Sequence, residues 1–229
     1  MFLPLFIDKM HQFLYRNEEA LDYLHSRRVT DEEIKEFKIG YSRVVSIHDD
    51  GSEDYENFMR ESYRGRAYER KIILPLYDLW GNPIGALGRA IDSKEFKYYL
   101  TKEGKFFGAF FGFFQALPEI YRTGRVFTVE GPFDFLAFRK VYPNVVATMT
   151  AELTDDQYEL LNFFAKDIIT VFDSDGPGRK AAERAREKWP KIKTVSLGFK
   201  DPDGALKYWS DPRKFTEYVK GIVSRTLII

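Results

Sequence analysis

The chain has 229 residues, 44% of them hydrophobic and 17% aromatic, a composition that suits one packed domain of ordinary size or two small ones. Its 35 basic residues balance its 35 acidic ones, so net charge favours neither nucleic-acid nor membrane binding, and any basic surface must be local. With no cysteine and three separated histidines, the chain holds no disulfide and no zinc finger or zinc ribbon, and we expect no zinc site.

The first ten residues carry no positively charged leader, and the aromatic run around residue 110 is too short and too rich in glycine to cross a bilayer. We therefore expect neither a targeting segment nor a membrane segment, and we expect the protein to be cytoplasmic.

Two small helices are predicted near the start of the chain. The first covers Asn17–Tyr23. The second begins after Thr30, because Thr30 followed three residues later by Glu33 is the pattern of a capping box, and it ends before Gly40.

Strands are predicted next. Lys71–Tyr77 and Pro83–Arg89 flank a turn at Trp80–Asn82, which indicates an antiparallel hairpin, and Phe96–Leu100 is a further candidate strand. We expect residues 1–123 to form a mixed α+β subdomain.

From about residue 124 the chain alternates strand-like and helix-like segments. The candidate strands are 126–129, 145–148, 168–172 and 193–198, and the candidate helices are 133–141, 154–165 and 178–188. Thr154 followed three residues later by Gln157 is the pattern of a capping box, which supports the start of the middle helix. Right-handed crossovers then require a four-stranded parallel sheet with helices on both faces, which makes the fold α/β in this part and α+β overall. We expect this domain to cover residues 124–210 and a C-terminal helix and tail to cover residues 211–229.

Two acidic motifs follow apolar, β-branched runs in this second part. They are Glu130–Asp134 and Asp173–Gly178, and each lies where a buried parallel strand ends in a glycine-containing turn. The carboxyl ends of adjacent strands meet at one edge of an open α/β sheet, and carboxylates gathered there need a divalent cation to stay ionised together. The sequence therefore predicts a magnesium site.

The spacing of the acidic residues indicates how they share this site. Asp173 and Asp175 are two residues apart and face one point if they lie on an extended chain. Asp134 falls on the first turn of a helix, where the helix dipole favours a carboxylate. Asp201 and Asp203, which follow the last strand, are a third acidic pair, although Asp-Pro and Asp-Gly are also ordinary turn dipeptides.

A Glu-Gly motif after one strand and an Asp-x-Asp-Gly-x-Gly motif after a later one resemble the TOPRIM domain of bacterial-type primases, topoisomerases and some nucleases. Further segments, in the same order along the chain, are similar to the bacterial (DnaG-type) primase catalytic core. They are Tyr23-Leu24, Arg27–Thr30, Phe37–Tyr41, Arg70–Asp78, Gly81 to Gly88-Arg89, Lys97–Leu100 and Phe111–Phe113. The resemblance covers roughly residues 20 to 210.

The chain also departs from the pattern of that family. After the second strand of the sheet it has Met149-Thr150-Ala151-Glu152 where the family usually has a Gly-Thr pair, and before the motif aspartate it has Pro132-Phe133 where the family has Tyr-Met. These departures indicate a divergent branch, of the kind found in phages or plasmids. The zinc-binding and helicase-interaction domains of full-length primases have no counterpart, so we expect a catalytic core alone.

The resemblance implies a DNA primase, a nucleotidyltransferase of the DNA-directed RNA polymerase type that makes short RNA primers on single-stranded DNA during replication. It implies catalysis by two Mg²⁺ or Mn²⁺ ions. The implied catalytic residues are Glu130, Asp134, Asp173 and Asp175. The implied metal ligands are Glu130, Asp173 and Asp175, with Asp201 and Asp203 in a supporting or second-metal role.

Basic and aromatic residues alternate between Arg60 and Lys105, a mixture that suits phosphate neutralisation and base stacking on single-stranded DNA. The resemblance favours four of the basic residues as contacts to template or nucleotide: Arg70, Lys71, Arg89 and Lys97. The implied partners are the DNA template, ribonucleoside triphosphates, and a replicative helicase or a separate zinc-binding module.

Two other functions remain open. A TOPRIM nuclease would use the same carboxylates to activate water, and the acidic motifs alone do not separate the two reactions. A non-catalytic module that binds single-stranded DNA or a helicase is disfavoured because Glu130, Asp173 and Asp175 are all retained. A topoisomerase would need a nucleophilic tyrosine on a further domain, for which the chain has no evident room.

Overall fold

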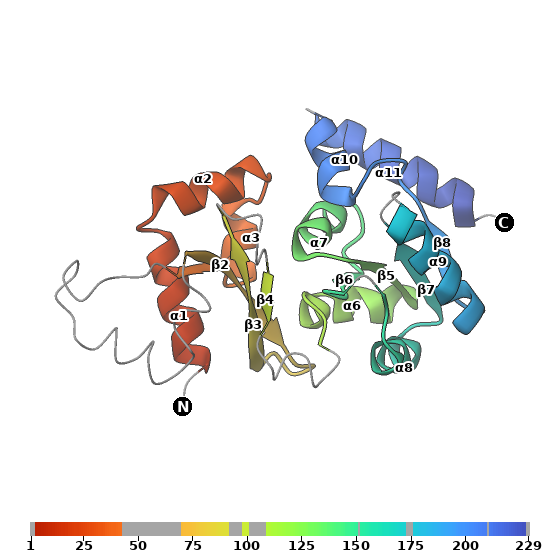
Figure 1. Ribbon diagram of the computed structural model, residues 1–229, viewed down its shortest axis with the longest axis horizontal. Coiled ribbons are helices and arrows are strands. Elements are labelled where there is room, and N and C mark those ends of the chain that lie inside the picture. The colour runs from red at the N-terminus through yellow and green to blue at the C-terminus, as the bar shows by residue number, and fades with distance from the viewer. Residues whose placement is uncertain are drawn as a thin grey trace. The chain divides into compact units, whose positions relative to one another are not determined.

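The computed structural model describes residues 3–42, 70–91, 98–100, 109–150, 152–172, 176–209 and 211–227. The chain divides into two compact units, Met1–Leu76 with Asn82–Phe106, and Tyr77–Gly81 with Phe107–Ile229 (Figure 1). Among the described helices, none combines the length and the apolar character that crossing a membrane requires.

The two predicted helices of the first unit are confirmed as α2 (Glu18–Ser26) and α3 (Asp31–Glu36). Asn17 caps α2, since its side chain accepts a hydrogen bond from the backbone of the first turn, and α2 continues three residues beyond its expected end. Thr30 caps α3 in the predicted capping box: the Thr30 backbone N–H donates to the Glu33 carboxylate at 2.8 Å.

Helix α1 (Leu3–Leu14) was not predicted. Its apolar residues recur on one face, and Phe6 and Met10 are fully buried in a cluster with the strand residues Ile73 and Ala86. A Cβ atom on Gly40 would lie 2.6 Å from the backbone carbon of Met10, so the helix crosses the strand at a distance that only glycine permits.

The strands of the first unit form one sheet in the order β1 (Gly40–Ser42), β2 (Lys71–Tyr77), β3 (Pro83–Ala90) and β4 (Tyr98–Leu100). β1 pairs with β2, and β3 with β4, in antiparallel register. β2 and β3 are neighbours joined by a connection too short for a parallel crossover, so the predicted hairpin is confirmed.

The second unit contains the predicted four-stranded parallel sheet, in the order β6-β5-β7-β8. Its strands are β5 (Arg125–Val129), β6 (Val145–Ala147), β7 (Asp167–Val171) and β8 (Lys193–Val195). The central pair, β5 and β7, is buried on both faces, as the continuous apolar runs predict.

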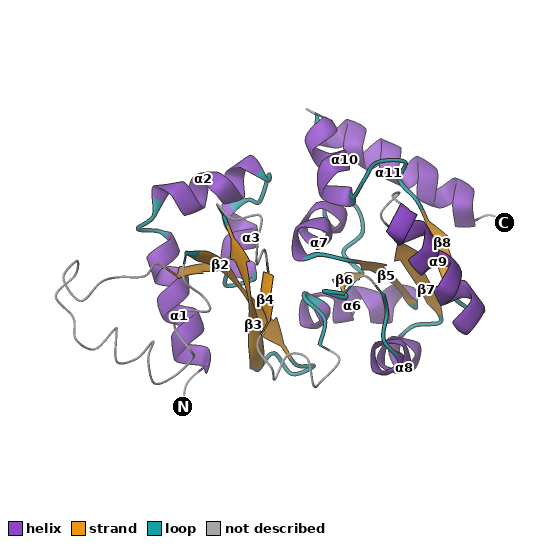
Figure 2. Ribbon diagram, in the orientation of Figure 1, coloured by secondary structure: helices purple, strands orange, loops and turns teal. Residues whose placement is uncertain are grey.

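Helices cover both faces of this sheet, which confirms the expected fold class (Figure 2). They are α6 (Phe113–Thr123), α7 (Pro132–Arg139), α8 (Asp155–Phe164), α9 (Gly176–Lys188), α10 (Pro202–Tyr208) and α11 (Pro212–Leu227). On one face, apolar residues of α6, α8 and α9 pack against Val126 and Ile168. On the other face, Phe138 of α7 packs on Phe127, with ring centroids 5.2 Å apart. Helix α6 was not predicted.

Candidate functional site

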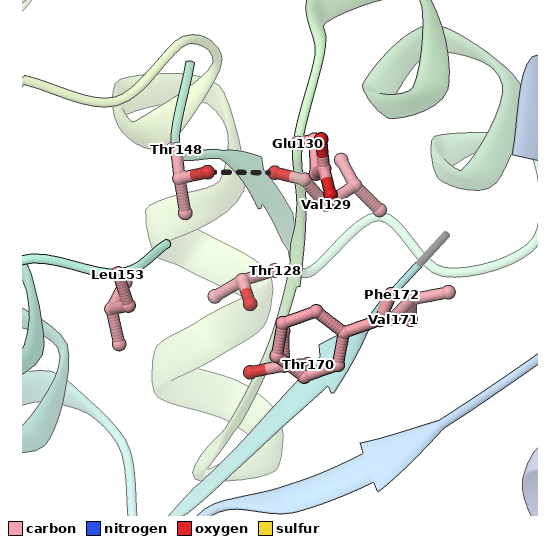
Figure 3. A pocket seen from close by; sticks show the side chains of 8 residues that line it. All are labelled: Thr128, Val129, Glu130, Thr148, Leu153, Thr170, Val171 and Phe172. Carbon is pink, nitrogen blue, oxygen red and sulfur yellow. Dashed lines mark hydrogen bonds between the residues drawn. The ribbon is translucent and has the colours of Figure 1, made fainter. Parts of the chain in front are cut away.

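Glu130 directly follows β5 at the carboxyl edge of the parallel sheet, where the sequence places the first acidic motif. A small pocket opens at this edge, and it is formed by the ends of β5 and β7 and by the chain that follows β6 (Figure 3). The residues that line it are Thr128, Val129, Glu130, Thr148, Leu153, Thr170, Val171 and Phe172.

The backbone of Glu130 is held by the segment that follows β6. The backbone N–H of Met149 donates to the Glu130 carbonyl at 2.8 Å. Thr148 donates to the Val129 carbonyl twice, from its backbone N–H at 2.9 Å and from its hydroxyl at 3.3 Å; Figure 3 shows the second of these bonds. The backbone of Glu130 is therefore held by contacts from the segment after β6 as well as by β5 itself.

Gln157 supports this arrangement from α8. Its side chain is 3% exposed and accepts from the backbone N–H of Thr154 at 3.1 Å in the predicted capping box. The same side chain donates to the carbonyl of Thr148 at 2.9 Å. Sequence reasoning identified Gln157 only as the capping-box partner of Thr154, because the contact with the segment after β6 has no local signature.

Met149 has a positive φ of 60°. It begins the segment Met149–Glu152, in which the chain departs from the Gly-Thr pair of the family that it resembles. A glycine adopts the left-handed conformation freely, whereas another residue is strained there by about 1–2 kcal/mol. The backbone bond from Met149 to Glu130 is therefore kept at a cost in stability.

Asp134 joins the start of α7 to the start of α10. One carboxylate oxygen accepts from the backbone N–H of Gly131 at 3.2 Å, as the third residue of a helix does in a capping box. The other oxygen accepts from the backbone N–H of Asp203 at 3.2 Å. The two helix N-termini thus share one carboxylate, whose charge is favourable for both helix dipoles.

The other acidic pair lies at the same junction. Asp201 caps α10, since its side chain accepts from the backbone N–H of Gly204 at 2.6 Å. Asp203 is 8% exposed and forms an ion pair with Lys207, one helical turn later, at 2.8 Å. The structure therefore brings Asp134, Asp201 and Asp203 together through backbone and ion-pair contacts.

Asp173 and Asp175 lie outside the described residues. Within the part of the chain that is described, no group of three or more His, Cys, Asp or Glu residues is placed to hold a metal ion. Phe172, the residue that precedes Asp173, lines the same pocket as Glu130.

Three of the four predicted basic contacts are described, all in the first unit, and Lys97 lies outside the described residues. The Arg70 side chain is 55% exposed and lies 4.0 Å from Glu19. Lys71 begins β2 and is half-buried. Arg89 on β3 is only 6% exposed, so most of its surface is already packed against protein.

Comparison with known proteins identifies two families in succession along the chain. Residues 9–116 match the family described as the N-terminal domain of the DNA primase catalytic core. Residues 127–206 match the family described as Toprim-like. Together they cover both units of the fold.

Individual proteins agree with these matches. A DNA primase of Aquifex aeolicus is 30% identical over 195 residues, which are 78% of this chain and 39% of that protein. The crystal structure of the zinc-binding and RNA polymerase domains of the Aquifex aeolicus primase is 25% identical, with a TM-score of 0.74 over 94% of this chain and 59% of that one.

A third match is a DnaG primase catalytic domain bound to single-stranded DNA, which shares the fold with a TM-score of 0.76 and 20% identity over 95% of this chain and 79% of that one. The chain thus spans about two-fifths of the length of the curated relative and most of the length of a catalytic domain. The order of the two matching families, the relatives and the shared fold agree, and the chain belongs to the family of TOPRIM-containing, bacterial-type (DnaG-like) DNA primase catalytic cores.

Proposed function

We propose that this chain is a nucleotidyltransferase that makes short RNA primers from ribonucleoside triphosphates on single-stranded DNA. The observation that carries the proposal is Glu130, held by backbone bonds at the carboxyl edge of a parallel sheet, within a Toprim-like segment that follows a primase N-terminal segment. This is the edge at which open α/β sheets bind their ligands.

The family implies dependence on a divalent cation, and we propose Mg²⁺ or Mn²⁺ held by Glu130, Asp173 and Asp175. The donor set fits, because all three supply the hard oxygen ligands that these ions prefer. Asp173 also directly follows a residue that lines the pocket of Glu130. When bound, the ions would favour ionisation of the attacking 3′-hydroxyl and neutralise charge on the leaving pyrophosphate.

The remaining acidic residues have a supporting role in this proposal. Asp134 and Asp201 accept backbone N–H bonds, and Asp203 is paired with Lys207, so these carboxylates order the two helix starts beside the site. The contacts that hold the segment after β6 keep the Glu130 backbone from moving when substrate charge enters the site.

The template contacts are proposed for the first unit. Arg70 and Lys71 lie at the start of β2 with exposed or half-exposed side chains that can neutralise phosphates. Lys97 and Arg89 complete the proposed set, Arg89 with the small part of its side chain that is accessible. A single-stranded DNA template is supported by the similar DnaG domain that is bound to single-stranded DNA. A helicase and a separate zinc-binding module are further proposed partners.

The test is primer synthesis from labelled ribonucleotides on single-stranded DNA, with Mg²⁺ or Mn²⁺, by the wild type and by Asp173→Asn. The matched control is Asp156→Asn, at an exposed position in the first turn of α8. Short labelled products that are lost only in Asp173→Asn support the proposal. Degradation of the template without synthesis would instead identify a nuclease, and binding without either reaction would identify a non-catalytic module.

A further inference from the structure

Two buried threonines lie in the pocket beside Glu130. Thr128 on β5 and Thr170 on β7 are direct partners across the two central strands. They are 0% and 7% exposed, and both line the pocket (Figure 3). Because side chains alternate along a strand, Thr128 shares its face of the sheet with Glu130, two residues later.

The surroundings of these hydroxyls are apolar. On the same face, Val126 and Ile168 precede the threonines by two residues, and both belong to the hydrophobic core. Leu153 and Phe172 complete the apolar wall of the pocket. A valine would have the shape of threonine at either position and no polar atom to bury.

Within the described part of the chain, neither hydroxyl oxygen has a hydrogen-bond partner, although both are buried. A buried hydroxyl normally finds a partner, since leaving it unpaired destabilises the fold. Two such hydroxyls opposite each other, in the pocket that holds the candidate metal ligand, point to a bound polar species and not to packing.

The size of the pocket restricts what that species can be. It has room for about one water molecule, which excludes a nucleotide or a sugar. Two hydroxyls and a carboxylate provide the two to four polar partners that a buried water requires. The third threonine of the pocket is Thr148. Its hydroxyl already donates to backbone carbonyls, so it is not needed as a partner of the water.

We infer that Thr128 and Thr170 are positioning residues, and that their hydroxyls hold one ordered water which donates a hydrogen bond to the Glu130 carboxylate. The inference rests on the proposed function, because it assigns Glu130 as a metal ligand. The water orients the carboxylate from the side that faces the threonines, as outer-sphere partners orient the ligands of a metal site. Loss of such partners weakens metal binding by about 10–100-fold.

The first experiment is a titration of the full chain with Mn²⁺, in which electron paramagnetic resonance measures the free ion. The second is a crystal structure of the metal-free wild type. The double variant Thr128→Val with Thr170→Val is expected to bind Mn²⁺ about 10-fold more weakly. Serine at both positions keeps the hydroxyls and is expected to restore the affinity. The matched control is Thr194→Val. Thr194 lies on β8 and is the strand partner of Thr170, but it does not line the pocket.

The crystal structure is expected to show a solvent peak within hydrogen-bond distance of Thr128, Thr170 and the Glu130 carboxylate. The inference is overturned if no such peak is present, or if the double valine variant binds Mn²⁺ like the wild type. Glu130→Gln is titrated beside them. If Glu130→Gln weakens Mn²⁺ binding and the valine variant does not, the threonine inference fails alone. If Glu130→Gln has no effect, the metal assignment of the proposed function fails, and the solvent peak still decides the water site.

Discussion

Asp134→Asn separates a structural from a metal-binding role for the second acidic residue of the first motif. In the structure, each oxygen of Asp134 accepts one backbone N–H bond, from Gly131 on its own helix and from Asp203 at the start of α10. Asparagine keeps one acceptor oxygen and presents an NH₂ group to the other N–H. One of the two bonds is therefore lost, and the remaining one no longer has a charged acceptor.

The size of the effect follows from these two changes. A hydrogen bond to a charged group contributes about 1.5–3 kcal/mol, and a neutral one contributes about 1 kcal/mol. Loss of one charged bond and weakening of the other therefore predict that Asp134→Asn lowers the free energy of unfolding by about 3 kcal/mol. This is a large part of the roughly 5–15 kcal/mol that stabilises a typical folded domain.

The assay is urea unfolding in EDTA, so that metal binding does not contribute to stability. The control is Asp156→Asn, which removes an exposed carboxylate from the first turn of α8 and is expected to cost less than about 1 kcal/mol. If Asp134 were instead one of several mutually repelling metal ligands, removing its charge from the metal-free protein would stabilise it. A gain in stability, or a loss no larger than that of Asp156→Asn, would refute the structural role.

Three further predictions concern stability, each measured by urea unfolding. Gln157→Leu removes the bond that its side chain accepts from the backbone N–H of Thr154 and the bond that it donates to the segment after β6, and it should cost about 2 kcal/mol. Gly112→Ala should cost more than about 3 kcal/mol, because Gly112 has a φ of 81° and an added Cβ would lie 2.2 Å from the buried ring of Phe135. A hydrogen bond from Lys193 is the chief reason that the pKa of Asp167 lies below its usual value. The ion pair therefore stabilises the fold above about pH 4, and this stabilisation is lost as the pH falls through the lowered pKa. Asp167→Asn should therefore cost less than about 1 kcal/mol at pH 7, since both side chains are more than a third exposed, and the difference from wild type should vanish in acid; a constant difference would contradict the assignment.

The elements that sequence analysis predicted are those with local signals. Thr154 and Gln157 form the expected capping box, and the apolar runs of β5 and β7 are long enough to identify buried parallel strands. The position of Glu130 at the sheet edge follows from these strands, because parallel strands end together.

Most of what it missed depends on distant partners. Helix α1 is the exception, because its apolar residues recur at helical spacing and are a local signal that sequence analysis overlooked. Helix α6 starts at Gly112, where a φ of 81° and a ring from α7 that leaves no room for a Cβ both require glycine. The contact between Asp134 and Asp203 joins residues 69 positions apart, so the sequence shows the helix cap but not the second helix that shares it. Thr128 and Thr170 resemble ordinary strand residues until their register and burial are known.

The central claim is that Glu130, fixed at the carboxyl edge of the parallel sheet, is a cation ligand of a primer-synthesising core. The most direct test is the yield of labelled RNA primers on single-stranded DNA by Glu130→Gln, compared with the wild type and with Asp156→Asn under the same conditions. We expect Glu130→Gln to lower the yield by at least about 100-fold while its urea midpoint stays close to that of the wild type, and we expect Asp156→Asn to retain activity. Primer synthesis by Glu130→Gln at the wild-type level would show that Glu130 is not a cation ligand of the reaction.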